Sequence, residues 1–256
     1  SASICIDGFI KSNVIATQAI HAKYGGVVPE LASRAHQQNI IPTIDQAIVQ
    51  AKITKNDVDA VAFTRGPGLL GSLLVGTSFA KSFALARNIP LIEVNHMQAH
   101  ILAHFIDDPK PSFPFLCLTV SGGHTQIVLV KDYFEMELIG QTLDDAAGEA
   151  FDKTAKILNL PYPGGPLIDK YGQLGDPNSF QLPEPKIADL NFSFSGLKTA
   201  ILYLVQDEVK KNPNFLDERL HDICASVQQR IVTILLNKVK KAAKLIFNNG
   251  DIVATT

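Results

Sequence analysis

The stretch Leu116–Val130, LCLTVSGGHTQIVLV, predicts two strands joined by a turn of small residues. Apolar side chains alternate over Leu116–Val120, and a β-branched run resumes over Ile127–Leu129. The turn between them is Ser121–Thr125, in which two glycines allow backbone amides to approach a ligand and to form an anion-binding nest. A simple hairpin turn is the alternative that this stretch alone favours, so the rest of the chain must decide.

Composition predicts a globular protein of one large or two modest domains, since 256 residues with 46% apolar content can bury a full core. We expect no membrane association and a cytoplasmic location, because no apolar run approaches about 18 residues and no signal segment opens the chain. The net charge of −2 argues against strong autonomous nucleic-acid binding. Three scattered cysteines, Cys5, Cys117 and Cys224, are predicted to be buried thiols.

The first half reads as antiparallel strands followed by an α/β unit. We expect strands over Ser1–Asp7 and Val14–Thr17, a helix over Pro29–Ala51, a buried strand over Asp59–Phe63 and a helix over Leu69–Arg87. Small residues on the last helix predict close packing against a sheet: Gly71, Ser72 and Gly76.

Histidines follow the next predicted strand, Pro90–Val94. His96 and His100 are four residues apart, a spacing that places them on one helix face where two imidazoles can share a metal. The carboxyl end of a strand in an α/β sheet is also where ligands bind, which favours a metal site over a structural pair. His104 is expected at the surface, and Met97 stands where a zincin has its glutamate, so that kind of peptide hydrolysis lacks its base.

A polar connector, Asp107–Pro111, predicts a boundary between an N-terminal subdomain, residues 1–107, and a C-terminal one, residues 112–256. The second half repeats the arrangement of the first, since the hairpin is followed by a strand over Tyr133–Gln141 and then by helices. Two halves of this kind resemble the actin-like superfamily of ATPases and small-molecule kinases, which bind nucleotide between the halves.

The helices of the second half carry acidic residues and a further glycine pair. A helix is predicted over Asp144–Leu158, whose first acids suit a helix start, whereas Asp152 in its interior indicates a ligand role. The loop Tyr162–Pro166 supplies the second glycine pair, so the region predicts a nucleotide cradle. A long helix is predicted over Leu220–Phe247 with lysines suited to its C-terminal dipole, and a strand starts at Asp251.

Seven motifs in a fixed order carry a resemblance to one family: YGGVVPELASRAH (Tyr24–His36), RGPGLLGSLLVG (Arg65–Gly76), NHMQAH (Asn95–His100), VSGGHTQ (Val120–Gln126), DDAAGEAFDKTAK (Asp144–Lys156), YPGGP (Tyr162–Pro166) and FSFSGLKT (Phe192–Thr199). Together they resemble the tRNA adenosine threonylcarbamoyltransferase family, called TsaD in bacteria. Each motif alone is weak, but the ordered set is specific and spans nearly the whole chain.

The resemblance implies an α/β fold of the actin-like, duplicated kind, with two α/β subdomains, a ligand cleft between them and a helical insertion in the second. It implies transfer of the threonylcarbamoyl group from threonylcarbamoyl-adenylate to N6 of the adenosine beside the anticodon, in tRNAs that read codons beginning with A. It further implies a paralogous actin-like partner of the TsaB type and a small ATPase of the TsaE type.

Carried over by position, the resemblance implies that His96 and His100 bind one iron or zinc ion. It implies that a five-residue loop holds the phosphate and acyl part of the adenylate: Thr119, Val120, Ser121, Gly122 and Gly123. It assigns the nucleoside side to Asp152, Gly165 and Asp169. No catalytic side chain is identified, because the tRNA amine attacks directly.

The sequence departs from the family in several places. Gln98 replaces an acidic residue common in the histidine motif. The family has a strand before Ser1, and a nucleotide-binding asparagine and a metal-binding aspartate beyond Thr256, so we expect this chain to be truncated relative to the family. The alternatives to the transferase are an ATPase or small-molecule kinase of the same fold, a metal-dependent endopeptidase, and a non-catalytic scaffold paralogue.

Overall fold

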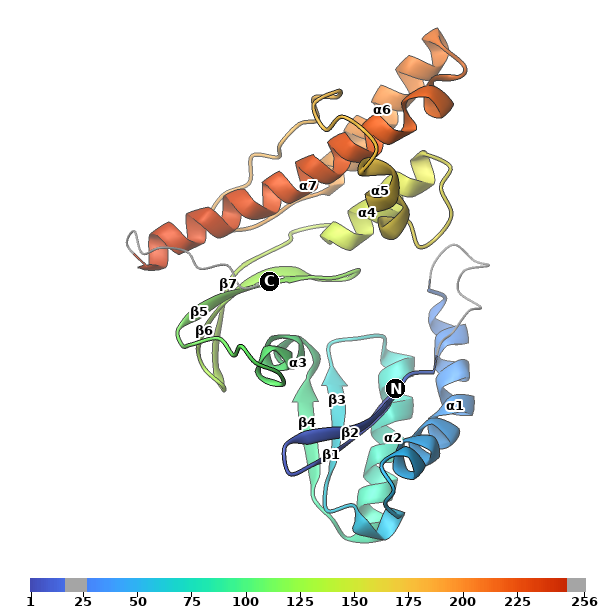
Figure 1. The fold of residues 1–256 in the computed structure, drawn as a ribbon, viewed down its shortest axis with the longest axis vertical. Coiled ribbons are helices and arrows are strands. Elements are labelled where there is room, and N and C mark those ends of the chain that lie inside the picture. Colours follow the sequence, from blue (N-terminus) through green and yellow to red (C-terminus); the bar gives the residue numbers. More distant parts are fainter. Residues whose placement is uncertain (17–26, 248–256) are drawn as a thin grey trace. The chain divides into compact units, whose positions relative to one another are not determined.

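A computed structural model describes residues 1–16 and 27–247 of the chain (Figure 1). The chain divides into two compact units, Ser1–His100 and Ile101–Thr256. The sequence placed its subdomain boundary slightly further on, in the connector at residues 107–112.

The first unit opens with an antiparallel pair, β1 (Ala2–Ile6) and β2 (Phe9–Val14). Asp7 and Gly8 join the strands in the left-handed region, with φ of 51° and 82°, which is the conformation of a tight hairpin turn that matches strand twist. Because a two-residue turn lets pairing resume at once, the second strand begins at Phe9. The predicted start at Val14 is therefore wrong, and Thr17 lies outside the described residues.

A parallel pair completes the described strands of this unit, residues 1–16 and 27–100. Strand β3 (Val61–Gly66) pairs with β4 (Leu91–Asn95), and α2 (Leu70–Arg87) makes the crossover between them. Helix α1 (Pro29–Gln50) packs against α2 and against the β1–β2 pair, and a short 3₁₀ turn, η2 (Lys55–Asp57), precedes β3 (Figure 1). The predicted α/β unit is confirmed.

Helix α2 packs against β3 as predicted, but its small residues face different neighbours. A Cβ added at Gly71 would lie 3.1 Å from the Cβ of Ser33, which belongs to α1, so the small residue serves a helix–helix contact. A Cβ at Gly76 would meet nothing within 4 Å. The reason is a cavity of about 530 Å³ in this unit, lined by apolar side chains of α1, α2 and β3 together with β1.

The second unit begins with a three-stranded antiparallel sheet of β5 (Phe115–Val120), β6 (Thr125–Asp132) and β7 (Glu135–Gln141). Val120 pairs with Thr125, so the hairpin predicted for the opening stretch is confirmed. Helix α3 (His96–Leu102) and a 3₁₀ turn, η3 (Ala103–Phe105), precede this sheet in the chain.

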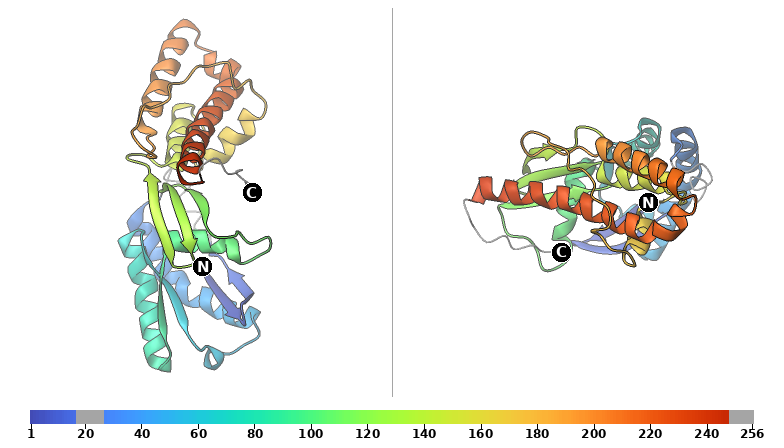
Figure 2. Two further views of the ribbon diagram at one scale, coloured as in Figure 1. Left: turned by 90° about the vertical axis from the view of Figure 1, so that its left-hand side faces the viewer. Right: turned by 90° about the horizontal axis from the view of Figure 1, so that it is seen from above.

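Four helices follow this sheet in the chain and pack against one another: α4 (Ala147–Ile157), α5 (Gly165–Gly172), α6 (Ser195–Lys211) and α7 (Phe215–Phe247) (Figure 2). Their apolar faces and the sheet share one core, at whose centre Phe192 and Phe194 are fully buried. The long helix starts five residues earlier than predicted, at Phe215, and the predicted strand at Asp251 lies outside the described residues. The mixed α/β class is confirmed.

The cysteines follow the prediction in two cases of three. Cys117 and Cys224 are buried, but Cys5 is exposed because it points to the outer side of the alternating strand β1. Within the described part of the chain, no helix combines the length and apolar character needed to span a bilayer.

Candidate functional site

The two histidines of the predicted metal site lie on α3, which begins at the residue after β4 ends. The side chain of Asn95 caps this helix, since its Oδ1 accepts hydrogen bonds from the amides of Met97 at 2.9 Å and Gln98 at 3.1 Å. The strand therefore passes into the helix with no intervening loop. This junction fixes the direction in which His96 and His100 project.

The rings of His96 and His100 converge as the sequence spacing predicted. Their Nε2 atoms are 3.2 Å apart, so one ring donates a hydrogen bond to the other when no ion lies between them. Two nitrogens at this separation, each about 2.0–2.1 Å from one ion, would subtend an angle of roughly 100°, close to tetrahedral. The donor pair therefore fits a shared iron or zinc ion.

The described residues around His96 and His100 supply neither a third metal-binding side chain of the usual kinds nor a general base beside His96. Among residues 1–16 and 27–247, no group of three or more histidine, cysteine, aspartate and glutamate side chains could hold a metal. Met97 is only 8% exposed and brings no acid or base to the position after His96. His104 lies on η3 and is exposed, in agreement with the prediction.

The glycine loop of the second unit, Ser121–Thr125, is a tight turn with two open backbone amides. The Ser121 amide donates to the His124 carbonyl at 2.8 Å, and the His124 amide donates to Ser121 Oγ at 3.0 Å, which closes the turn on itself. Gly122 and Gly123 are exposed, and within the described residues neither amide has a hydrogen-bond partner. A Cβ at either glycine would meet nothing within 4 Å, so a ligand can approach these amides freely.

The two residues before this turn differ in exposure. Thr119 is buried at 8% and Val120 is 44% exposed, as expected for successive residues at the end of a strand. Of the five predicted loop residues, Gly122 and Gly123 are thus the ones whose amides a ligand can reach, because the backbone amide and carbonyl of Ser121 are already hydrogen-bonded.

The N-terminus of α4 packs directly on the glycine loop. The Ala147 amide donates to Thr125 Oγ1 at 2.8 Å, and the Gly148 amide donates to the Ser121 carbonyl at 3.2 Å. A Cβ at Gly148 would lie 2.7 Å from that carbonyl oxygen and 2.8 Å from Gly122 Cα, so only glycine fits at this position. The loop and the helix start therefore form one rigid assembly, with the positive end of the helix dipole beside the free amides.

The predicted nucleoside residues take up intramolecular contacts around α4 and α5. Asp152 Oδ1 accepts a hydrogen bond from the Gly164 amide at 2.8 Å, which ties the second glycine pair to α4. Gly165 is the first residue of α5. Asp169 is exposed and accepts hydrogen bonds from the side-chain amides of Gln173 at 3.1 Å and Gln228 at 2.9 Å. Their role toward a nucleoside stays a prediction.

The acidic pair before α4 does not start that helix as predicted, because the helix begins only at Ala147. Asp145 instead pairs with Lys153, which also contacts Glu149 at 2.9 Å. The hydrogen bonds from Lys153 to Asp145 and Glu149 raise the pKa of the Lys153 ammonium. Lys153 therefore offsets part of the negative charge of Asp145 and Glu149.

Asp144 has a partner that sequence reasoning missed. Its carboxylate accepts four hydrogen bonds at the start of α6, from the Ser193 hydroxyl, the Phe194 amide at 2.7 Å, and the Ser195 amide and hydroxyl at 3.2 and 2.8 Å. Burial alone would raise the pKa of Asp144, but the bonds from Ser193, Phe194 and Ser195 outweigh it and hold the pKa below 3.8. The alternation of phenylalanine and serine over residues 192–195 was the available sign, since it turns both hydroxyls to one side.

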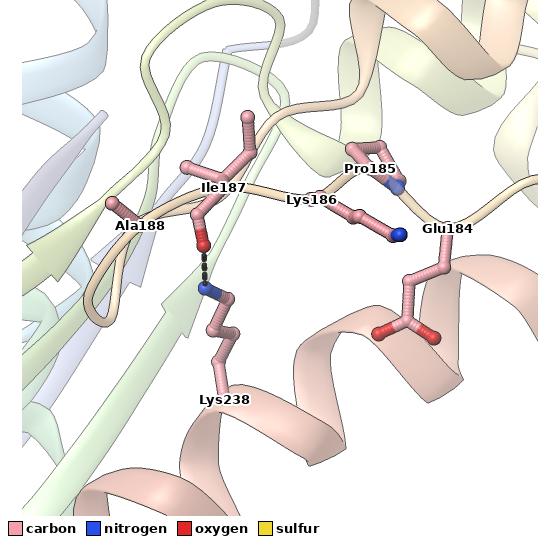
Figure 3. Close-up of a pocket in the computed structure, with 6 residues that line it drawn as sticks. All are labelled: Glu184, Pro185, Lys186, Ile187, Ala188 and Lys238. Carbon is pink, nitrogen blue, oxygen red and sulfur yellow. Dashed lines mark hydrogen bonds between the residues drawn. The ribbon is translucent and has the colours of Figure 1, made fainter.

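The lysines of α7 also differ from the prediction. Lys238 donates to the carbonyls of Ile187 and Asp189, both at 2.9 Å, and Lys241 donates to Asp189 at 3.2 Å. These bonds hold the segment 184–190 along α7, beside a cavity of about 590 Å³ (Figure 3). Burial, and then the charge of Lys241, lower the pKa of Lys238. These two lysines therefore anchor a neighbouring segment.

Comparison with known proteins places all these residues in one context. A family model described as TsaD, tRNA N6-adenosine threonylcarbamoyltransferase, matches residues 9–254. A protein of that name from Christiangramia forsetii is 66% identical over 247 residues, covering 95% of this chain and 73% of that protein. Another of the same name from Riemerella anatipestifer is 65% identical, covering 95% of this chain and 72% of its own length.

Solved structures give a weaker likeness. A chain described as YeaZ from Pseudomonas aeruginosa matches with a TM-score of 0.30 and 22% identity, covering 40% of this chain and 50% of that one. A second, described as similar to peptidase YEAZ, has a TM-score of 0.31 and 18% identity, with coverage of 62% and 59%. Likeness at this level carries no weight for the function.

Proposed function

The chain belongs to the tRNA N6-adenosine threonylcarbamoyltransferase family, and we propose that it transfers a threonylcarbamoyl group to N6 of an adenosine in tRNA. The observation that carries the proposal is the match over residues 9–254, within which lie both the histidine pair and the glycine loop. We propose the finer details that the resemblance implies: threonylcarbamoyl-adenylate as donor, the adenosine beside the anticodon of tRNAs reading ANN codons as acceptor, and a cytoplasmic reaction.

In this scheme the chain positions a donor whose leaving group is a phosphate. The N6 amine of the adenosine attacks the carbamoyl carbon, the bond from that carbon to the phosphate oxygen breaks, AMP leaves, and the amine gives up a proton. The free amides of Gly122 and Gly123 would hold the phosphate charge as it develops on leaving. Asp152, Gly165 and Asp169 would contact the nucleoside.

The histidine pair would supply the metal site. We propose that His96 and His100 hold one iron or zinc ion, supported by the 3.2 Å separation of their Nε2 atoms. When bound, such an ion polarises or orients the carbonyl of an acyl group. Asn95 would set the direction of both imidazoles by capping the helix that carries them.

We also propose that the protein works with a paralogous actin-like partner of the TsaB type and a small ATPase of the TsaE type. Both follow from the family resemblance. An endopeptidase is disfavoured, because the buried side chain of Met97 occupies the place of the general base that such a reaction needs.

The test is a reconstituted modification reaction. The full-length protein is incubated with threonine, bicarbonate, ATP, the adenylate-forming enzyme, both partners and unmodified tRNA, and nucleosides are analysed by mass spectrometry. We expect threonylcarbamoyl-adenosine, and its loss in the variant carrying His96→Ala and His100→Ala.

His104→Ala is the matched control, since this exposed imidazole lies just past the same helix and outside the pair. It should retain full activity. Consumption of ATP with a small-molecule acceptor and no modified nucleoside would favour the kinase alternative, and omission of each partner in turn tests whether it is required.

A further inference from the structure

Asp144 connects two parts of the second unit that are far apart in sequence. Its partners lie 49 to 51 residues further along the chain, at the first turn of α6. A carboxylate in this place satisfies amides that have no partner within the helix, and its charge is favourable beside the positive end of the helix dipole. Phe192 and Phe194, on the other side of the same segment, are fully buried in the core. Residues 192–195 are thus held by hydrogen bonds to Asp144 on one side and by core packing on the other.

The residues next to Asp144 bind that segment and the end of the glycine loop. The Leu143 amide donates to the Phe192 carbonyl at 3.0 Å, and the Thr142 amide donates to the Thr125 carbonyl at 2.8 Å. The Thr142 hydroxyl donates to the Asp145 carbonyl at 2.7 Å, which shapes the turn that leads into α4. Residues 142–148 therefore contact the glycine loop at both ends, and the start of α6 through Asp144 between them.

Resting on the proposed function, we propose that Asp144 is a positioning residue for the donor site. By fixing the start of α6 to residues 142–148, it holds Thr125 and the N-terminus of α4 in register with Gly122 and Gly123. It thereby sets the affinity of the free loop amides for the phosphate of a nucleotide. Asp144 itself touches no substrate in this scheme.

The experiment compares the loop in three variants of the full-length protein. Asp144→Asn keeps the shape of the side chain but removes its charge and one acceptor. We expect the dissociation constant for AMP, measured by calorimetry, to rise about tenfold. We also expect faster hydrogen exchange in a peptide covering residues 116–126, because the loop loses its support.

Asp222→Asn is the matched control. Asp222 also joins distant segments, since it accepts hydrogen bonds from the Asp176 amide and from Arg219, both at 2.8 Å, but it lies on α7 with no bond to residues 142–148. Its variant should lower the melting temperature and leave both AMP affinity and loop exchange unchanged. A role for Asp144 in stability alone predicts the same pattern for Asp144→Asn, and that result would overturn the proposal.

Ser195→Ala is a milder variant in case Asp144→Asn folds poorly. It removes one of the four hydrogen bonds and keeps the carboxylate, so a rise of about threefold in the AMP dissociation constant is expected. No change in this variant, together with unaltered loop exchange, would also count against the proposal. If the wild type does not bind AMP, the proposed donor fails, and the exchange rates still decide whether Asp144 holds the loop.

Discussion

The two units of this chain differ in how completely their interiors are filled. Among the described residues, every large side chain that is fully buried belongs to the second unit, with Phe192 and Phe194 at its centre. In the first unit the buried apolar residues are mostly alanines, and a cavity of about 530 Å³ lies between its helices and strands. The cavity of about 590 Å³ in the second unit lies outside its core, between the segment 184–188 and Lys238. The glycine loop thus stands on a close-packed support, whereas the histidine pair belongs to the more loosely filled unit.

The largest effect is expected from removing a core ring. Phe194→Ala should reduce the free energy of unfolding by about 3–5 kcal/mol, because the surrounding core cannot close over the space left behind. Phe79→Ala, which truncates a ring lining the existing cavity of the first unit, should cost clearly less. Denaturant unfolding of both variants measures the difference, and equal costs would show that the two interiors are equally well packed.

A second comparison adds a methyl group. Gly148→Ala should cost about 1–3 kcal/mol and weaken nucleotide binding, because the new Cβ meets the backbone of Ser121 and Gly122. Gly76→Ala should instead stabilise by up to about 1 kcal/mol, since it removes a helix glycine and the site is open. Thermal melts of the pair provide the measurement. A stabilised Gly148→Ala would contradict the close approach of α4 to the loop.

The third prediction concerns how the stability of the second unit depends on pH through Asp144. The pKa of Asp144 is lowered in the folded state, so the ionised carboxylate stabilises the fold above its ordinary pKa of 3.8 and this contribution is lost as the pH falls through the lowered value. Asp144→Asn should therefore have a lower free energy of unfolding than the wild type at neutral pH. This difference should shrink as the pH falls below about 3.8. Denaturant unfolding at a series of pH values measures this difference in the free energy of unfolding. A difference that stays constant from neutral to acid pH would contradict the prediction, because it would mean that the hydrogen bonds do not favour the charged carboxylate.

The smallest effect concerns thiol chemistry. Cys5 is exposed on the first unit, whereas burial raises the pKa of Cys224 in the second unit to about 11. At neutral pH, iodoacetamide should modify Cys5 quickly and leave Cys224 unmodified until the protein unfolds. Peptide mass spectrometry after brief labelling checks this, and equal labelling would mean that the second core opens readily.

The sequence predicted the elements well where a periodic pattern was long or a turn was strongly encoded. The hairpin around Ser121–Thr125, helix α2 and the i, i+4 pairing of His96 with His100 all follow from local spacing. The predicted start of the second strand is wrong because Asp7 and Gly8 form a two-residue turn, which no apolar pattern reveals. The predicted start of α4 is too early because Asp144 and Asp145, which would suit a first helical turn, bind Phe194 and Lys153 instead.

Contacts between residues far apart in the chain could not be predicted from sequence spacing. No spacing rule connects Asp144 with Ser195, or Lys238 with the carbonyl of Asp189, because each pair depends on how helices pack on the sheet. Gly148 did carry a sign in the sequence, since glycine in a helix lowers its stability and often marks a close approach. The neighbour that requires it, the loop at Ser121, becomes visible only in the structure.

The direct passage from β4 into α3 restricts how the chain can change in length. Asn95 ends the strand and caps the helix, and His96 follows at once, so no spare residue separates the sheet from the histidine pair. One inserted residue would turn the pair by about 100° around the helix axis and displace it by about 1.5 Å. Insertions and deletions should therefore be absent at this junction in working relatives.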